Sequence, residues 1–153
     1  MEIRAGKILV STDAMEDINF EKSIVVIANN DEKGTLGFVI NKPFGRNLNE
    51  LEEFKQSPPF PLYAGGPVDT EHLFFIHRRP SLVQGGTLIT GDLFLSGDFA
   101  RAVAEINKGN LSSAEIKIFV GYCGWDDNEL ENEILEGSWT LQDADIDKLF
   151  TER

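Results

Sequence analysis

Cys123 and the two histidines, His72 and His77, are the side chains whose chemistry could support catalysis or metal binding. A thiol beside an imidazole can act as a nucleophile with its base, but nothing in the sequence places Cys123 next to His77. Cys123 also ends an apolar run between Gly121 and Gly124, and cysteine often packs as a small buried hydrophobic residue. We therefore favour a packing role for Cys123 and predict no catalytic residue.

The spacing of the histidines does not suit a metal site. Five positions along a strand place His72 and His77 on opposite faces, because side chains alternate along a strand. The sequence also has no CxxC or HExxH pattern that could supply ligands for zinc. We therefore expect neither a metal ion nor another cofactor.

His77, Arg78 and Arg79 form the one dense basic cluster in an acidic chain. A guanidinium group presents several donors in one plane and can hold a carboxylate or another anion. The cluster could therefore bind a small anionic ligand. The alternative, which we favour, is that these arginines pair with some of the 26 acidic residues of the chain.

The segment Gly65-Gly66-Pro67 could bring backbone N–H groups towards a ligand, or it could be a turn that needs glycine torsion angles. It matches neither the P-loop pattern nor the dinucleotide-binding fingerprint. We favour the turn. Trp125 is expected to anchor the core, although an aromatic residue between a strand and a helix could also line a pocket.

The elements that would position these residues form a strand-rich pattern. Strands are predicted over 23–29, 35–41, 72–78, 87–90, 93–96, 115–122 and 138–141, and helices over 47–54, 99–108, 127–136 and 145–150. Helices do not alternate regularly with strands, so a doubly wound sheet is not expected. The pattern predicts an α+β fold with a mainly antiparallel, curled sheet.

Acidic residues outnumber basic ones: 26 Asp and Glu stand against 14 Lys and Arg in 153 residues, which gives a net charge of −12. A field of this sign repels the phosphates of nucleic acids, and no helix-turn-helix pattern is visible. We therefore predict no nucleic-acid partner.

The charge is concentrated at the end of the chain, where residues 126–153 include ten acidic and two basic residues. Such a segment is typical of a solvated face, and the alternative is a docking surface for a basic partner. We predict that residues 142–153 form an acidic C-terminal extension that is peripheral to the fold. Ile146, Leu149 and Phe150 could still hold a short helix in place.

The lone cysteine, the absence of a signal-peptide pattern in the first residues and the absence of a long apolar stretch favour a cytoplasmic protein with no membrane partner.

Six motifs, in order over residues 6–139, resemble those of the AlgH/YqgE family of small bacterial proteins. They are 6–11 (GKILVS), 20–27 (FEKSIVVI), 34–43 (GTLGFVINKP), 63–68 (YAGGPV), 73–77 (LFFIH) and the segment from 121–125 (GYCGW) to 137–139 (GSW). Residues 140–153 lie outside the recognisable pattern. The family usually has alanine where Cys123 stands, which further disfavours a nucleophilic thiol.

The resemblance implies a single α+β domain over residues 1–153, with a sheet of barrel-like shape and a few peripheral helices. It does not imply an activity. Our first hypothesis is a non-enzymatic binding or regulatory domain whose partner is a protein or a small anionic ligand. The alternatives are a transcriptional regulator and an enzyme of a kind that the motifs do not reveal.

Function tends to lie on loops and strand ends that a rigid scaffold holds in place. On that ground the candidate binding residues are Asn41, Pro43, Gly65, Gly66, Pro67, His77, Arg78 and Trp125.

Overall fold

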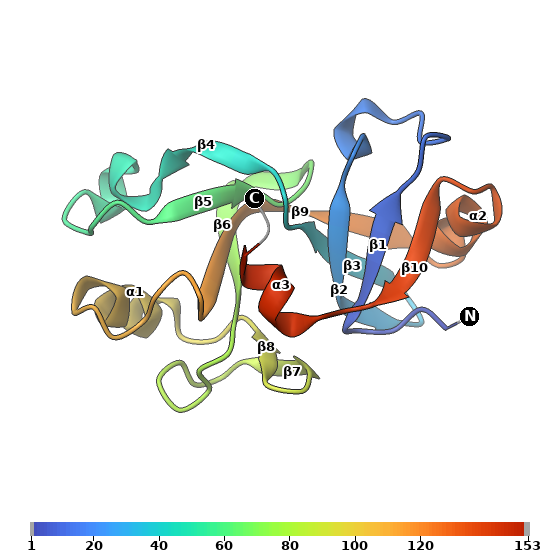
Figure 1. Ribbon diagram of the computed structural model, residues 1–153. Coiled ribbons are helices and arrows are strands. Elements are labelled where there is room, and N and C mark those ends of the chain that lie inside the picture. Colours follow the sequence, from blue (N-terminus) through green and yellow to red (C-terminus); the bar gives the residue numbers. More distant parts are fainter. Residues whose placement is uncertain (1, 152–153) are drawn as a thin grey trace.

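A long central strand, β9 (Ile116–Asp126), joins the two halves of a ten-stranded sheet (Figure 1). The structure is a computed structural model and describes residues 2–151, to which all counts refer. The other strands are β1 (Lys7–Ser11), β2 (Ile24–Asp31), β3 (Gly34–Val39), β4 (Pro43–Asn47), β5 (Pro61–Ala64), β6 (Val68–His77), β7 (Thr87–Thr90), β8 (Leu93–Leu95) and β10 (Trp139–Asp143). The helices are α1 (Phe99–Asn107), α2 (Glu129–Leu135) and α3 (Ile146–Thr151), with single-turn 3-10 helices η1 (Ile18–Phe20), η2 (Leu48–Glu50) and η3 (Glu52–Phe54).

One half of the sheet consists of β10, β1, β2 and β3, all antiparallel to their neighbours. β2 is rich in β-branched residues, which favour extended backbone, and Val25, Val26 and Ile27 are fully buried. A tight connection between Asp31 and Gly34 returns the chain as β3. This hairpin confirms the strands predicted over 23–29 and 35–41.

The other half is built around the first part of β9, which lies between β5 and β6. β5 is parallel to β9, and the remaining pairs β4–β5, β6–β9, β6–β8 and β7–β8 are antiparallel. The prediction of a mainly antiparallel sheet in an α+β fold is therefore confirmed.

The sheet is curled but not closed into a barrel. Its strand order, β10-β1-β2-β3-β9-β6-β8-β7, leaves β10 and β7 at the two ends instead of pairing them. Figure 1 shows α3 in front of the sheet, between its two halves. Leu149 and Phe150 of α3 belong to the same core cluster as Val26 of β2 and Ile89 of β7. Side chains of α3 thus pack between the two halves of the sheet, whose end strands would pair with each other in a closed barrel.

The segment predicted as one helix over 47–54 is instead two separate 3-10 turns. Leu51, between them, has extended torsion angles of φ −86° and ψ 134°. The Glu50 carboxylate accepts a hydrogen bond from the backbone N–H of Asn47 at 2.7 Å. This local cap ends the first turn after three residues, so the helical spacing of the apolar residues does not produce a continuous helix.

Within the described residues the chain beyond residue 141 is not peripheral, and Leu149 and Phe150 hold the short helix α3 in place, as their apolar character suggested. β10 continues to Asp143 in register with Lys7 of β1, and Leu149 and Phe150 are 2% and 8% exposed. The buried Lys117 of β9 also donates a hydrogen bond to the carbonyl oxygen of Leu149 at 2.8 Å. The acidic residues between these apolar positions face solvent, which is why composition alone suggested a loose tail.

Within residues 2–151, none of the helices combines the length and the apolar character needed to cross a membrane.

Direct backbone packing between the 65–66 segment and β9 holds the two halves of the sheet together. The N–H of Gly65 donates to the carbonyl of Val120 at 2.9 Å, and the carbonyl of Gly65 accepts from Val39 N at 2.8 Å. A Cβ added to Gly66 would collide with the backbone of Tyr122. Only glycine allows two backbones to approach this closely.

We predict that Gly66→Ala lowers the free energy of unfolding by about 3 kcal/mol, because the backbone that the new methyl meets cannot move aside as a side-chain tip could. The matched control is Gly109→Ala. Gly109 also has a positive φ, of +79°, but nothing lies within 4 Å of its added Cβ, so its loss should be only about 1–2 kcal/mol. Urea denaturation measures both, and equal losses would contradict the packing argument.

Candidate functional site

The eight residues predicted as a binding face are distributed along β9 instead of lining one cavity. His77 pairs with Ile116, at the start of β9, whereas Gly65 bonds to Val120 near its middle. Trp125 lies towards its other end, paired with Thr35 of β3. The structure therefore brings Asn41, Pro43, Gly65, Gly66 and Pro67 into one neighbourhood but leaves His77, Arg78 and Trp125 apart from it. Ligand binding by these residues stays a prediction.

Asn41 and Pro43 organise the path of the chain between β3 and β4. The Asn41 side-chain oxygen accepts from Ile24 N at 3.0 Å, and its amide nitrogen donates to the carbonyl of Lys22, also at 3.0 Å. Pro43 opens β4 opposite Tyr63. Both polar groups of the Asn41 side chain are therefore occupied within the fold.

His77 is fully buried and both its ring nitrogens have partners. Nδ1 accepts from Arg79 N at 3.1 Å, so Nε2 carries the proton and donates to the carbonyl of Ser96 at 3.0 Å. Burial disfavours the charged imidazolium and lowers the pKa of His77 below its ordinary value of 6.5, although the bond to Ser96 acts in the opposite direction. His77 is thus a neutral member of the core in this state.

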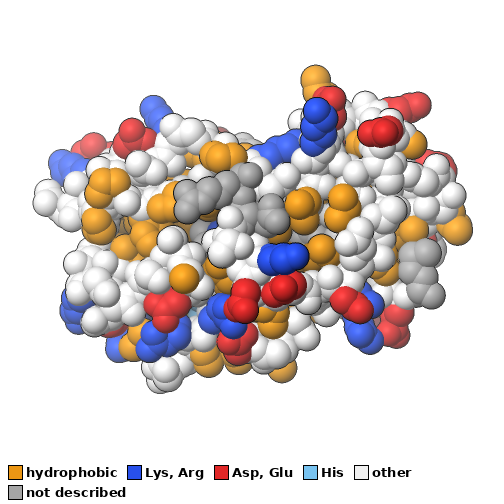
Figure 2. All heavy atoms as spheres, viewed as in Figure 1, with side chains coloured by type: hydrophobic (Ala, Val, Ile, Leu, Met, Phe, Trp, Pro, Cys, Tyr) orange, Lys and Arg blue, Asp and Glu red, His pale blue; other side chains and the backbone are white. Residues whose placement is uncertain are grey.

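Arg78 attaches α3 to the β7–β8 turn. Its Nε donates to Asp92 at 3.1 Å and its Nη1 to Asp147 at 2.6 Å, and the guanidinium lies 5.8 Å from the ring centre of Phe150. Figure 2 shows acidic and basic side chains side by side around α3. Arg78 is therefore engaged by carboxylates of the chain, as is Arg79, whose Nη1 donates to Glu115 at 2.6 Å.

Trp125 anchors the core, as expected, together with Trp139. Their indole nitrogens donate to one oxygen of Glu133 at 3.2 and 2.9 Å. The two rings lie 6.1 Å apart, edge to face. Trp125 also borders an open hollow beside Gly34 and Tyr122, but only 4% of it is exposed.

Cys123 is fully buried, and burial raises the pKa of its thiol to about 12. Its Sγ lies 3.3 Å from the carbonyl oxygen of Gly65. A thiol in this environment is not a nucleophile near neutral pH, because the reactive species is the thiolate.

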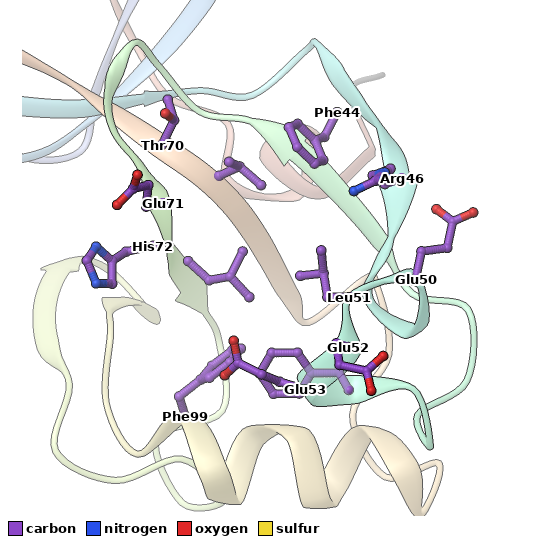
Figure 3. Close-up of a pocket in the computed structure, with 13 residues that line it drawn as sticks. Phe44, Arg46, Glu50, Leu51, Glu52, Glu53, Thr70, Glu71, His72 and Phe99 are labelled. Atoms are coloured by element: carbon purple, nitrogen blue, oxygen red, sulfur yellow. The ribbon is translucent and has the colours of Figure 1, made fainter.

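A different part of the surface forms a pocket, which we call the groove. It has a volume of about 450 Å³, with an apolar floor of Leu51, Phe54, Leu73, Phe99 and Val120 and with Phe44 at its mouth (Figure 3). Its polar lining consists of Arg46, Glu50, Glu52, Glu53, Thr70, Glu71 and His72. None of the eight sequence-predicted site residues belongs to this set.

The groove exists because α1 covers only part of an apolar sheet face. Ile116, Ile118 and Val120 of β9 belong to the same core cluster as Ala102 and Ile106 of α1. Val120 itself is buried, but the apolar side chains packed around it are only partly buried. Figure 3 shows the labelled side chains around an open space bounded by α1 below and by β4 and β6 at the sides. The groove thus lies beside a face that a helix already occupies.

Both strand walls of the groove are irregular. β4 is in register with β5 only at Pro43 and Asn47, with a shift between them. The register of β6 on β9 breaks between Val68 and Leu73, and Asp69 adopts a left-handed φ of +52°. Such bulges turn side chains out of the sheet. Phe44, 37% exposed, therefore stands at the groove mouth.

Asp69 and His72 form a close pair on the β6 wall, with 2.6 Å between Oδ1 and Nδ1. The hydrogen bond that Asp69 accepts, followed by its charge, raises the pKa of His72 above 6.5. The left-handed φ of Asp69 is one that Asp adopts more often than most non-glycine residues do.

Sequence analysis missed the groove because its lining comes from four separate segments. The one local signal is Phe44, an aromatic residue placed beside Gly45 and Arg46 in a stretch that is otherwise polar. Leu51 and Phe54 were assigned to a continuous helix that does not form.

Fold and groove together define a small α+β protein with an open, apolar-floored site. A family model described as AlgH-like (DUF179) matches residues 8–153. The chain therefore belongs to the AlgH-like family, and the match extends over the C-terminal residues that the motif pattern left out.

Individual relatives agree with this assignment. A UPF0301 protein of Bacteroides fragilis is 37% identical over 148 residues, which are 96% of this chain and 75% of the relative. One from Chlorobium phaeobacteroides is 32% identical over 99% of this chain and 81% of its own.

Solved structures show the same fold. The solution structure of the AlgH protein from Pseudomonas aeruginosa superposes with a TM-score of 0.79 at 29% identity, covering 97% of this chain and 81% of that one. The crystal structure of protein DIP2367 from Corynebacterium diphtheriae gives a TM-score of 0.81 at 21% identity, covering 99% and 82%.

The environment of His77 predicts a pH effect on stability. The pKa of His77 is lowered in the folded state, so on acidification the unfolded chain binds a proton at His77 before the folded protein does. The free energy of unfolding should therefore fall as the pH drops below about 6.5. Replacing His77 by Gln should remove this pH dependence. The difference in the free energy of unfolding between the wild type and His77→Gln should therefore shrink between about pH 7 and pH 5.

The matched control is His72→Gln, because the pKa of His72 is shifted upwards. The contribution of His72 to the free energy of unfolding is present at low pH and is lost as the pH rises through its raised pKa. The pH trend should therefore have the opposite sign to that of His77. Urea denaturation of the three proteins across this range measures both trends. A difference between wild type and His77→Gln that does not change with pH would contradict the buried neutral imidazole.

Proposed function

We propose that the protein is a non-catalytic binding protein whose groove receives the apolar face of a partner protein. One observation carries the proposal: beside the apolar sheet face that packs against α1, the partly buried side chains of Leu51, Phe54, Leu73 and Phe99 line an open groove. Exposed concave apolar surfaces with polar rims are the usual sites of partner binding. A regulatory role would follow from which partner is bound.

The placement of polar groups also favours binding over catalysis. The floor of the groove is apolar, while its ionisable groups belong to residues that are exposed at the rim. Catalytic acids and bases usually act in sites that exclude water and shift their pKa values strongly. The lone, buried cysteine supports a cytoplasmic location for this binding.

The aromatic residues of the groove give it a firm shape. The rings of Phe54 and Phe99 lie 5.7 Å apart at 84°, and Phe99 lies 5.3 Å from Phe75 of the core. Edge-to-face aromatic contacts of this kind fix ring positions. The groove is therefore largely formed before a partner arrives, which reduces the entropic cost of binding.

Binding of the neutral apolar dye Nile red tests this proposal. We expect the wild-type protein to bind the dye with enhanced emission, and Phe44→Glu to weaken binding about fivefold or more, because a charge then stands at the mouth of an apolar site. The control is Leu88→Glu, which places the same charge at an exposed apolar residue on β7 and should bind as the wild type does. Absence of dye binding to the wild type, or equal binding by Phe44→Glu, would overturn the proposal.

A further inference from the structure

The rim of the groove is predominantly acidic. Four carboxylates, those of Glu50, Glu52, Glu53 and Glu71, stand there with one guanidinium, Arg46, and one imidazole, His72. Figure 3 shows Glu71 and His72 on the β6 side, across the apolar floor from Arg46 and Glu50. The positive charge that His72 can carry is balanced by Asp69, which it contacts directly.

Two of the four carboxylates have no hydrogen-bond or ion-pair partner among residues 2–151, although the charge of Glu71 contributes to raising the pKa of His72. Glu50 accepts a hydrogen bond from Asn47 N, and Glu52 lies 3.2 Å from Lys55 Nζ. No hydrogen bond or ion pair within the described part of the chain engages Glu53 on η3 or Glu71 on β6. These two acidic groups flank the floor from different walls.

We propose that the groove binds a basic amphipathic helix of another protein, with apolar residues on one face and Lys or Arg beside them. This inference rests on the proposed function and names the chemistry of its partner. A helix suits the surface because α1 already packs on the same sheet face, and helices that bind grooves present apolar residues at positions i, i+3, i+4 and i+7. Lysines or arginines flanking such a stripe would meet Glu53 and Glu71 and pair with them.

The charge of the whole chain strengthens this choice. A net charge of −12 attracts cationic partners over distance and speeds their association. The same field disfavours nucleic acids and anionic lipid surfaces at an acidic rim.

A second copy of this chain does not supply a basic amphipathic helix among its described residues. Among the described residues, the most exposed large apolar residue of an α-helix is Leu135 of α2, at 81%. Its neighbours on that helix include Glu131 and Glu133, and Glu136 follows it. Docking α2 into the groove of another copy would bring like charges together, which disfavours self-association through this surface.

The test uses three synthetic helical peptides of about 18 residues with one identical leucine face, a length sufficient for partial helicity in water. Their polar faces carry only Lys, only Gln or only Glu. Fluorescence anisotropy measures the affinity of each labelled peptide for the full chain. We expect the Lys peptide to bind at least about tenfold tighter than the Gln peptide at low salt, with the difference shrinking as salt is added, and the Glu peptide to bind most weakly.

Two double variants show whether the rim is responsible. Glu53→Gln with Glu71→Gln should weaken the Lys peptide about fivefold and leave the Gln peptide unchanged. The matched control, Glu131→Gln on α2 with Glu136→Gln just after it, removes the same net charge away from the groove and should leave both affinities close to those of the wild type.

The possible failures are distinguishable. If the Lys and Gln peptides bind equally and Phe44→Glu weakens both, the groove is a binding site but the basic partner is wrong. If the control variant weakens the Lys peptide as much as the rim variant does, the attraction is a general charge effect and the inference fails. If neither peptide binds, the proposed function fails with it.

Discussion

The fold depends on one close contact, in which the backbone of Gly65 and Gly66 lies directly against β9. It allows a single strand to bond with β3, β5 and β6 in turn, so that two half-sheets share one spine. Gly121 completes the contact from the β9 side, with a φ of +75° that turns the strand between its two sets of neighbours. A side chain on these glycines would separate the halves, because the nearest atom that its Cβ would meet is in each case a backbone atom.

The groove is a consequence of how α1 and its neighbours cover β9. α1 is nine residues long, or about 13–14 Å, and its Ala102 and Ile106 share a core cluster with the apolar face of β9. Beside it, two bulged strands and a pair of 3-10 turns border the face, and the Leu51 and Phe54 side chains that pack against it there are only partly buried. An apolar surface left in contact with water is unfavourable in free energy, and a partner helix would remove that cost.

Elements governed by local chemistry were predictable from the sequence. The β-branched residues of β2 indicate a buried strand, and Asp98, whose side chain accepts from Arg101 N at 3.1 Å, marks the start of α1. What the sequence could not show depends on distant contacts. The C-terminal helix looked peripheral until Lys117 and Arg78, which hold it, were placed beside it, and the groove requires side chains from four segments that only the folded sheet brings together.

The central claim is that a partner binds in the groove beside this apolar face. Its most direct test is a nuclear magnetic resonance titration of isotope-labelled protein with the basic amphipathic peptide. The account predicts that amide signals of Phe44, Leu73 and Val120 shift progressively and saturate, while those of Leu88 on β7 and Leu135 on α2 stay in place. Saturable shifts centred on β7 or α2, with the groove signals unchanged, would contradict it.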